Sequence, residues 1–469
     1  MESQKQSTFA LFFGNRGFFP ASLQANAREE LARSLKKLGH ETLMLDVDAT
    51  RYGAVETPRE GEVYANFLRE NQGNFDGVIL CLPNFGDETG AVAALKTANV
   101  PILIQAYPDD LDKMASSQRR DAFCGKFSIM DIFFQHGLKF TVLPPHAVSP
   151  ESEDFAEQVR YFDKICQVVK RIRNFTVGAI GARTTAFKTV RIDELTLQRN
   201  GITVETLDLS DVFSQIRDVQ LTTDKAKEKA HLLEGYTRWK GVPQEAFDNI
   251  VRLGVVLDNL IDEMRFDAIA LRCWVELQKE FGISPCTIVS ELNERCIAAA
   301  CEVDIGSAVT MHALSAASKT VATCLDWNNN YGEEKDKCIL FHCGPVPQSM
   351  MTAKGQVTDH AILATVIGEK KGYGCNVGRI APMPMTFGNL ITDEGKMKFY
   401  LGEGRFTEDP IPDNFFGCAG VAQIENLQDT LLTIGYQGHR HHVAVSPGHH
   451  LAPVHEALDK YLEFEITTV

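Results

Sequence analysis

The stretch AACEVDIG, residues 299–306, ends an apolar run abruptly in a carboxylate. The run CIAAAC, residues 296–301, has the continuous apolar character of a strand that helices cover on both faces. Glu302 follows it directly, and Asp304 comes two residues later. A polar side chain is tolerated where such a strand leaves the sheet, because that edge borders a crevice. The stretch therefore predicts an α/β sheet with Glu302 at its edge and Asp304 as the N-cap of the next helix.

Two further predicted strands end in a similar way. TVATCL, residues 320–325, is followed by Asp326, and KCILFHC, residues 337–343, contains His342 near its end. We expect these strands to be parallel neighbours of the first, so that the three side chains converge at one edge. Carboxylates and imidazoles without thiolates suit Mn²⁺ or Mg²⁺ better than structural zinc. The pattern therefore predicts a divalent-metal site that includes Glu302.

The segment GHRHHVAVSPGHH, residues 438–450, is the second region rich in candidate ligands, with five of the 13 His. His441 and His442 open a predicted strand, so we expect their side chains to point to opposite faces. One of them can then face a cleft while the other packs or caps. His449 and His450 follow a Ser-Pro-Gly turn, where exposure in a loop is the simpler interpretation.

The first part of the chain alternates strands and helices, and this order predicts a parallel sheet covered by helices. Its strands are predicted at 8–13, 41–46, 77–82 and 101–107. A helix that starts at Ser149-Pro150 leads to a second α/β unit, with strands at 175–181, 201–209 and 267–272 before those described above. From about residue 350, short alternating runs and more Gly and Pro indicate a β-rich domain. The predicted domains are 1–170, 171–350 and 351–469.

Composition sets broad limits on the function. The 469 residues carry a net charge of −15, which argues against a nucleic-acid partner, since phosphate binding needs a basic surface. No run of about 18 apolar residues and no signal-peptide pattern is present, so we expect no membrane segment and a cytoplasmic location. The 12 Cys are scattered, which favours free thiols in a reducing compartment.

Four motifs carry a resemblance to a known family: AACEVDIGSAVTMHAL, LDWNNN, FHCG and GHRHHVAVSPG. In these the chain resembles the L-fucose isomerase / L-arabinose isomerase superfamily, in particular its fucose-isomerase-like members. The interval of 24 residues between Glu302 and Asp326 agrees with the fucose isomerases, whereas the arabinose isomerases use a second Glu. The resemblance implies two Rossmann-like parallel-sheet domains, a β-rich C-terminal domain, and an aldose–ketose isomerase that uses Mn²⁺ or another divalent cation such as Mg²⁺ or Co²⁺.

The resemblance also assigns residues. It implies Glu302, Asp326 and His442 as metal ligands, with His441 as the alternative within the pair and His342 as a further candidate. It implies a homo-oligomer, a trimer or hexamer, whose subunits share active sites. The candidates for contact with the sugar are Arg16 and Asn84, which follow two predicted strands of the first domain, and Asn328 in the LDWNNN motif.

An aldose–ketose isomerase moves a proton between C1 and C2. A divalent ion that holds O1 and O2 polarises the carbonyl, and Glu302 and Asp326 are the expected proton carriers along an ene-diol route. A metal-assisted hydride shift stays open. The alternatives are a sugar-binding protein, a metal-dependent hydrolase or aldolase, and a catalytically idle relative. The sugar is not identified, and the basic residues that could recognise an anionic substituent are Arg16, Arg183, Lys188 and Arg191.

Overall fold

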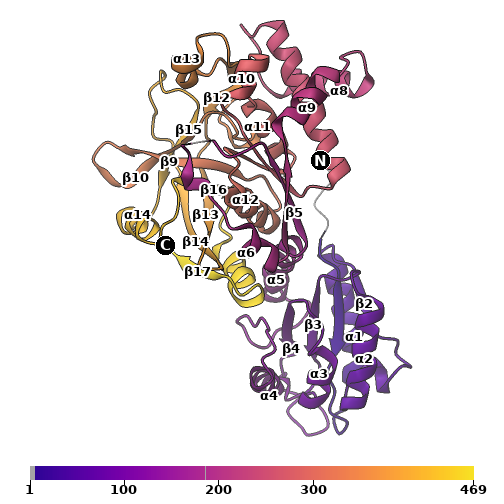
Figure 1. The fold of residues 1–469 in the computed structure, drawn as a ribbon. Helices are drawn as coiled ribbons and strands as arrows, with labels where there is room; N and C mark the ends of the chain where they lie inside the picture. Colours follow the sequence, from indigo (N-terminus) through magenta and orange to yellow (C-terminus); the bar gives the residue numbers. More distant parts are fainter. Residues whose placement is uncertain (1–5, 185) are drawn as a thin grey trace. The chain divides into compact units, whose positions relative to one another are not determined.

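The computed structural model describes residues 6–184 and 186–469 (Figure 1). The chain divides into two compact units, one that runs to Lys170 and one that runs from Arg171 to Val469. The finer division into three domains stays a prediction. Among the described residues, none of the helices has the length and apolarity needed to cross a membrane.

The first unit is a parallel four-stranded sheet in the order β2-β1-β3-β4. Three of its strands are buried along their whole length, as their apolar sequences predict. The strands are β1 (Phe9–Phe13), β2 (Thr42–Met44), β3 (Gly77–Leu82) and β4 (Ile102–Ala106). The helices are α1 (Ser22–Lys37), α2 (Pro58–Glu70), α3 (Glu88–Leu95) and α4 (Ala122–Gln135).

Helix α5 (Glu153–Ile172) begins three residues later than the Ser149-Pro150 signal predicts. The reason is the cap: the hydroxyl of Ser152 accepts the N–H of Phe155 at 3.1 Å, so Ser152 fills the N-cap position.

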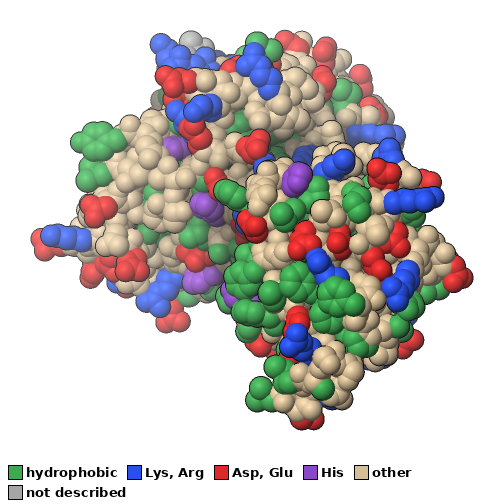
Figure 2. Space-filling model, turned by 90° about the horizontal axis from the view of Figure 1, so that it is seen from below, with side chains coloured by type: hydrophobic (Ala, Val, Ile, Leu, Met, Phe, Trp, Pro, Cys, Tyr) green, Lys and Arg blue, Asp and Glu red, His purple; other side chains and the backbone are tan. Residues whose placement is uncertain are grey.

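The first unit also exposes part of its apolar surface. Phe123, Phe127 and Phe134 of α4 are each about half exposed or more. Figure 2 shows hydrophobic side chains gathered on the face of the molecule that is seen from below.

The second unit starts with another parallel sheet, in the order β6-β5-β7-β8. Its strands are β5 (Phe175–Ile180), β6 (Ile202–Leu207), β7 (Ala268–Leu271) and β8 (Ala298–Cys301). Its helices are α6 (Glu194–Arg199), α7 (Leu209–Asp218), α8 (Asp224–Tyr236), α9 (Gln244–Met264), α10 (Glu276–Phe281), α11 (Cys286–Glu294) and α12 (Ile305–Ser318).

The rest of the second unit is built on a nine-stranded sheet. Six of its strands close into an antiparallel barrel in the order β15-β10-β9-β16-β13-β14, because β14 also pairs with β15. The strands are β9 (Thr323–Tyr331), β10 (Glu334–His342), β11 (Gln356–Thr358), β12 (Cys375–Arg379), β13 (Met383–Asp393), β14 (Lys396–Phe406), β15 (Cys418–Gln423), β16 (His442–Pro447) and β17 (Glu465–Thr468). The helices are α13 (Ala361–Ile367), α14 (Leu427–Tyr436) and α15 (Leu451–Glu456). The predicted fold class is confirmed: two parallel α/β sheets and a β-rich C-terminal part.

The predicted arrangement of the last strands is wrong. β9 and β10 are not parallel neighbours of β8 but form an antiparallel hairpin of the barrel, with a two-residue turn at Gly332-Glu333. Asp326 accordingly lies within β9 rather than after it. A buried barrel strand and a buried parallel strand are both continuous apolar runs, so apolarity alone does not separate them.

Candidate active site

A cavity of about 360 Å³ in the second unit contains the predicted cluster. Five predicted ligands line it together with a predicted sugar contact, Asn328. The five are Glu302, Asp326, His342, His441 and His442. Residues far apart in the sequence therefore meet around one small space, although the strands that bring them there pair differently from the prediction.

A tight turn directs Glu302 into this cavity. β8 ends at Cys301, and Glu302 and Val303 then both take left-handed backbone conformations, with φ of 56° and 60°. Such a conformation costs about 1–2 kcal/mol for each non-glycine residue, so the surrounding structure must hold it. Asp304 accepts the N–H of Ser307 at 3.1 Å and caps α12, which confirms its predicted role.

Strand pairing brings the remaining ligands to Glu302. His442 of β16 stands directly opposite Asp326 of β9, and its Nε2 lies 3.5 Å from Asp326 Oδ1. The same Nε2 lies 3.9 Å from Glu302 Oε2. His342, at the end of β10, places its own Nε2 3.6 Å from that Glu302 oxygen. One carboxylate oxygen therefore faces two imidazoles.

A buried network fixes the ring of His442. Its Nδ1 lies 2.7 Å from Asp304 Oδ2. A carboxylate only accepts, so in the neutral form of the ring Nδ1 carries the hydrogen and the lone pair of Nε2 faces Glu302 and Asp326. Arg440 forms a buried ion pair with Asp304. Burial raises the pKa of Asp304, but Arg440 and His442 more than offset this and hold that pKa far below its usual value.

Gly306 makes room for this network. A Cβ at this position would lie 2.9 Å from Arg440 Nη1 and 2.5 Å from the carbonyl oxygen of Leu390. Glycine therefore lets the guanidinium group approach Asp304 closely.

His342 is held in the opposite tautomer. Its Nδ1 accepts the backbone N–H of Cys343 at 2.9 Å, so the ring hydrogen of the neutral form is on Nε2. In that form the hydrogen on Nε2 points toward Glu302 Oε2, 3.6 Å from Nε2. His342 also forms, with Glu302 and His442, a group that could hold a metal ion, and its role as a ligand stays a prediction. The partners of their Nδ1 atoms therefore distinguish His342 from His442, which the sequence alone does not do.

Two carboxylate oxygens in the cavity accept no hydrogen bond from the described residues. Glu302 Oε2 and Asp326 Oδ1 are buried and have no hydrogen-bond partner among residues 6–184 and 186–469. Burial raises the pKa of Glu302, but the imidazoles of His342 and His442 more than offset this and lower it to about 2. Each of these two carboxylate oxygens lies within 4 Å of His442 Nε2, and oxygen and imidazole donors suit a divalent cation such as Mn²⁺. Two groups with ligand atoms within 4.8 Å of one another share His442: one adds Glu302 and His342, and the other adds Asp326 and His441.

His441 and Asn328 also face the cavity. The expectation that His441 and His442 point to opposite faces is wrong, because β16 begins only at His442 and strand alternation does not apply to His441. The Nε2 of His441 lies 3.6 Å from Asp326 Oδ1. Asn328 has no partner in the β9–β10 register, so it forms a bulge, a feature that often redirects a side chain beside an active site.

Arg16 and Asn84 belong to the first unit, where they hold a loop together. Asn84 is buried, donates to Asn15 Oδ1 at 2.6 Å and accepts the N–H of Arg16 at 3.2 Å. Arg16 pairs with Glu88 and donates from Nε to the carbonyl of Gly86 at 2.7 Å. Their contact with a sugar stays a prediction.

Three residues of the cavity wall escaped the sequence analysis. Cys273 and Trp274 donate to Glu302 Oε1 at 3.3 and 3.2 Å. They follow β7, the neighbour of β8, so the rule that polar groups gather at strand ends would have found them. His360 caps α13 through Nδ1, and burial lowers its pKa to about 4. We find no sequence signal for it.

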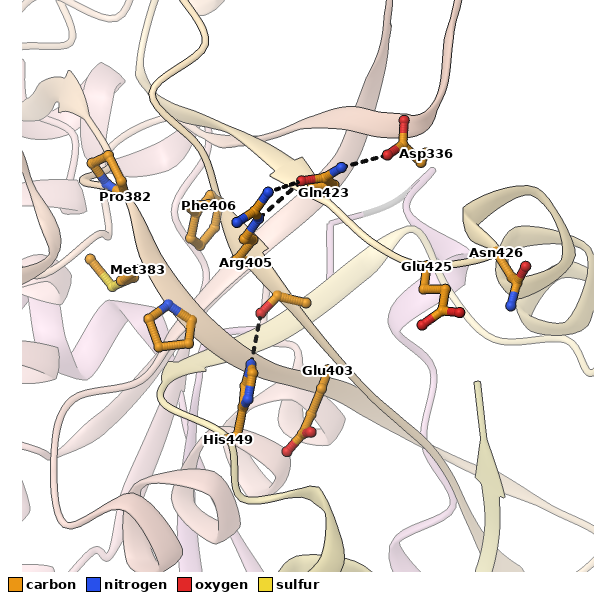
Figure 3. Close-up of a pocket in the computed structure, with 12 residues that line it drawn as sticks. Asp336, Pro382, Met383, Glu403, Arg405, Phe406, Gln423, Glu425, Asn426 and His449 are labelled. Carbon is orange, nitrogen blue, oxygen red and sulfur yellow. Dashed lines mark hydrogen bonds between the residues drawn. The ribbon is translucent and has the colours of Figure 1, made fainter.

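A larger cavity, of about 760 Å³, lies elsewhere on the barrel and does not hold this chemistry (Figure 3). Arg405 donates to Gln423, which donates to Asp336, so these polar groups satisfy one another. Its single histidine, His449, belongs to none of the potential metal-binding groups among the described residues. Size alone would therefore have selected the wrong site.

Comparison with known proteins agrees with the geometry. Residues 10–173 match the family model described as fucose/sulfoquinovose isomerase, N-terminal domain, and residues 340–469 match L-fucose isomerase, C-terminal domain. The chain belongs to the L-fucose isomerase-like family. The two matches together cover more than half of this L-fucose isomerase-like chain.

Curated relatives of this L-fucose isomerase-like protein carry a related name. The sulfoquinovose isomerase of Priestia megaterium is 21% identical, over 82% of this chain and 84% of the relative. That of Alkalicoccus urumqiensis is 23% identical, over 80% and 82%. The protein is thus an isomerase, an intramolecular oxidoreductase. A sugar-binding module and a hydrolase or aldolase, the alternatives left open by the sequence, do not describe this family.

Proposed function

We propose that the protein interconverts an aldose and the corresponding ketose with the help of a divalent cation, Mn²⁺ in the first place. One observation supports this most directly. Two buried carboxylate oxygens without hydrogen-bond donors among the described residues, Glu302 Oε2 and Asp326 Oδ1, face the lone pair of His442 in a cavity of sugar size. Glu302, Asp326 and His442 would hold the cation. His441 would complete this set or contact the sugar.

A bound cation would polarise the carbonyl of the sugar and lower the free energy of negative charge on O1 and O2. Glu302 and Asp326 are the proposed proton carriers. They reach the cavity from different elements, the turn after β8 and strand β9, so one can remove a proton while the other returns it. His342 presents an N–H to the same space and can donate to a sugar oxygen. Phe187, Trp274 and Phe341 line the wall and exclude water.

The relatives' name suggests a sulfonated hexose as the first substrate to test. The described residues that line the cavity include no Lys or Arg, so a sulfonate would be recognised at its rim or by another part of the protein. Arg183 and Lys188 are candidates, because Arg183 donates to the carbonyl of Phe187, a residue of the cavity wall, at 3.1 Å. Arg16 of the first unit is a third candidate.

We further propose a cytoplasmic homo-oligomer in which a neighbouring subunit completes the active site. No disulfide joins the described cysteines, which is compatible with a reducing compartment. Size measurement of the purified protein by light scattering tests the oligomer.

A panel of aldoses that includes sulfoquinovose and L-fucose tests the function. Ketose formation should disappear after chelation and return with Mn²⁺. Glu302→Gln and Asp326→Asn should each reduce kcat by at least about 100-fold, the lower bound for loss of a general acid–base group. Glu403→Gln, in the larger cavity, is the control and should keep activity. Turnover that persists in metal-free protein, or no ketose from any aldose, would contradict the proposal.

A further inference from the structure

The two oxygens of Glu302 face chemically different surroundings. Oε2 faces the imidazoles of His342 and His442. Oε1 instead accepts from the thiol of Cys273 at 3.3 Å and from the indole N–H of Trp274 at 3.2 Å. One carboxylate therefore stands between a nitrogen-rich group and a sulfur-containing group.

A second thiol completes the sulfur-containing side. Cys301 ends β8, and Cys273 comes two residues after the end of β7, where Leu271 and Cys301 are partners in the parallel register. The two sulfurs and a Glu302 oxygen all lie within 4.8 Å of one another. Both thiols are buried, at 6% and 2% exposure, and both line the cavity. A ligand in the cavity can therefore reach them.

This donor set differs in kind from the one on the other side of Glu302. Sulfur ligands select soft or borderline ions, whereas carboxylates and imidazoles suit Mn²⁺ and Mg²⁺. In a tetrahedral site with Zn–S bonds of about 2.3 Å, two sulfurs lie about 3.8 Å apart, which the spacing of the group allows. Two thiolates, one carboxylate and one open position form an ordinary zinc-type coordination shell.

We propose that Cys273, Cys301 and Glu302 Oε1 form a second cation site, which binds a thiophilic divalent ion of the Zn²⁺ or Cd²⁺ class. Both thiols release their protons to solvent as the two metal–sulfur bonds form, and a water molecule takes the fourth position. Because Glu302 belongs to both sites, an ion bound here competes with the cation held by Asp326 and His442. This effect on catalysis rests on the proposed function, whereas binding of the ion does not.

Titration of the full-length, metal-free protein with Cd²⁺ tests the proposal, because thiolate-to-Cd²⁺ charge transfer gives an ultraviolet band. We expect the band to saturate and the double variant Cys273→Ser/Cys301→Ser to lose the part that corresponds to about one ion per chain. Serine keeps a hydroxyl donor for Glu302 Oε1, so the orientation of this carboxylate should be retained. Cys286→Ser is the matched control, since Cys286 lines the same cavity outside the group and the band should persist.

Activity supplies the second measurement. The Cd²⁺ concentration that halves Mn²⁺-dependent turnover should rise at least about tenfold in the double variant and stay unchanged in Cys286→Ser. Identical Cd²⁺ spectra of the wild type and the double variant would overturn the site. A thiol-dependent band in a protein that converts no aldose would instead uphold the site and refute the proposed function.

Discussion

His342 and His442 flank the same oxygen of Glu302, at 3.6 and 3.9 Å, yet their rings are held in opposite ways. A backbone N–H binds Nδ1 of His342 and leaves a hydrogen on Nε2. A carboxylate binds Nδ1 of His442 and leaves a lone pair on Nε2. The comparison teaches that the partner behind a histidine, more than its distance from a carboxylate, decides whether it can ligate a metal ion or donate a hydrogen bond.

The two histidines also differ in the extent of their support. His342 is held by the next residue of its own chain segment. His442 is held by Asp304, which in turn contacts Arg440 and the hydroxyl of Ser307 at 2.6 Å. Two segments far apart in the sequence, 304–307 and 440–442, therefore meet to orient this imidazole, as expected for a ligand that needs a fixed direction.

Replacing each histidine by alanine should give the largest contrast. His442→Ala should weaken Mn²⁺ binding more than about 100-fold, since it removes a ligand whose supporting partners alone contribute 10–100-fold. His342→Ala should leave Mn²⁺ affinity within a few-fold and reduce kcat about 100-fold through loss of a donor. Calorimetric Mn²⁺ titration and steady-state kinetics measure both. Equal losses of Mn²⁺ affinity in the two variants would show that His342 and His442 do not differ in metal binding.

Asp304→Asn should produce the next largest effect. It changes the group behind His442 from a pure acceptor to one that can also donate, and Mn²⁺ affinity should fall about 10–100-fold. It also leaves Arg440 buried without its counter-charge, which destabilises a fold by about 3–5 kcal/mol.

The double variant Asp304→Asn/Arg440→Met separates these two effects of Asp304→Asn. Chemical denaturation should show most of the stability restored, while Mn²⁺ titration should show the affinity still low. Recovery of affinity along with stability would mean that Asp304 acts only through the fold.

Gly306→Ala tests the same network with a smaller change. The added methyl group would collide with Arg440 and with the carbonyl of Leu390, and we expect a loss of about 1–3 kcal/mol of unfolding free energy. Gly435→Ala in α14 is the matched control, because open space surrounds that position and alanine should stabilise the helix by about 0.5–1 kcal/mol. Urea denaturation compares the two. Similar stability changes at both sites would show that Arg440 needs no such space.

Much of the site could be read from the sequence because polar residues interrupt apolar runs. Glu302 and Asp326 were found in this way, although the second lies within an antiparallel strand rather than at the end of a parallel one. The predicted ligands still meet in the structure, because the β9–β16 register places Asp326 opposite His442. The two-residue turn at Gly332-Glu333 was the available signal for the hairpin.

Other features had no local signal. The tautomers of His342 and His442 depend on contacts with Cys343 and Asp304, and the second of these spans 138 residues. The left-handed turn at Glu302 was unpredictable, since neither Glu nor Val favours positive φ. Such features arise from tertiary packing, which overrides local preference.

His441→Gln should give the smallest effect, and it tests whether a histidine without a partner behind its ring contributes to metal binding. His441 keeps 42% of its side chain exposed, and its ring meets the ring of Phe187 edge to face. Among the described contacts, no hydrogen-bonded partner fixes its tautomer. Burial and the neighbouring His442 lower its pKa, which favours the neutral imidazole that either role needs. We expect Mn²⁺ affinity to change less than about threefold, well below the 10–100-fold of an oriented metal site, and KM for the sugar to rise less than about tenfold. A loss of Mn²⁺ affinity as large as that of His442→Ala would show that a histidine can ligate here without a partner behind it.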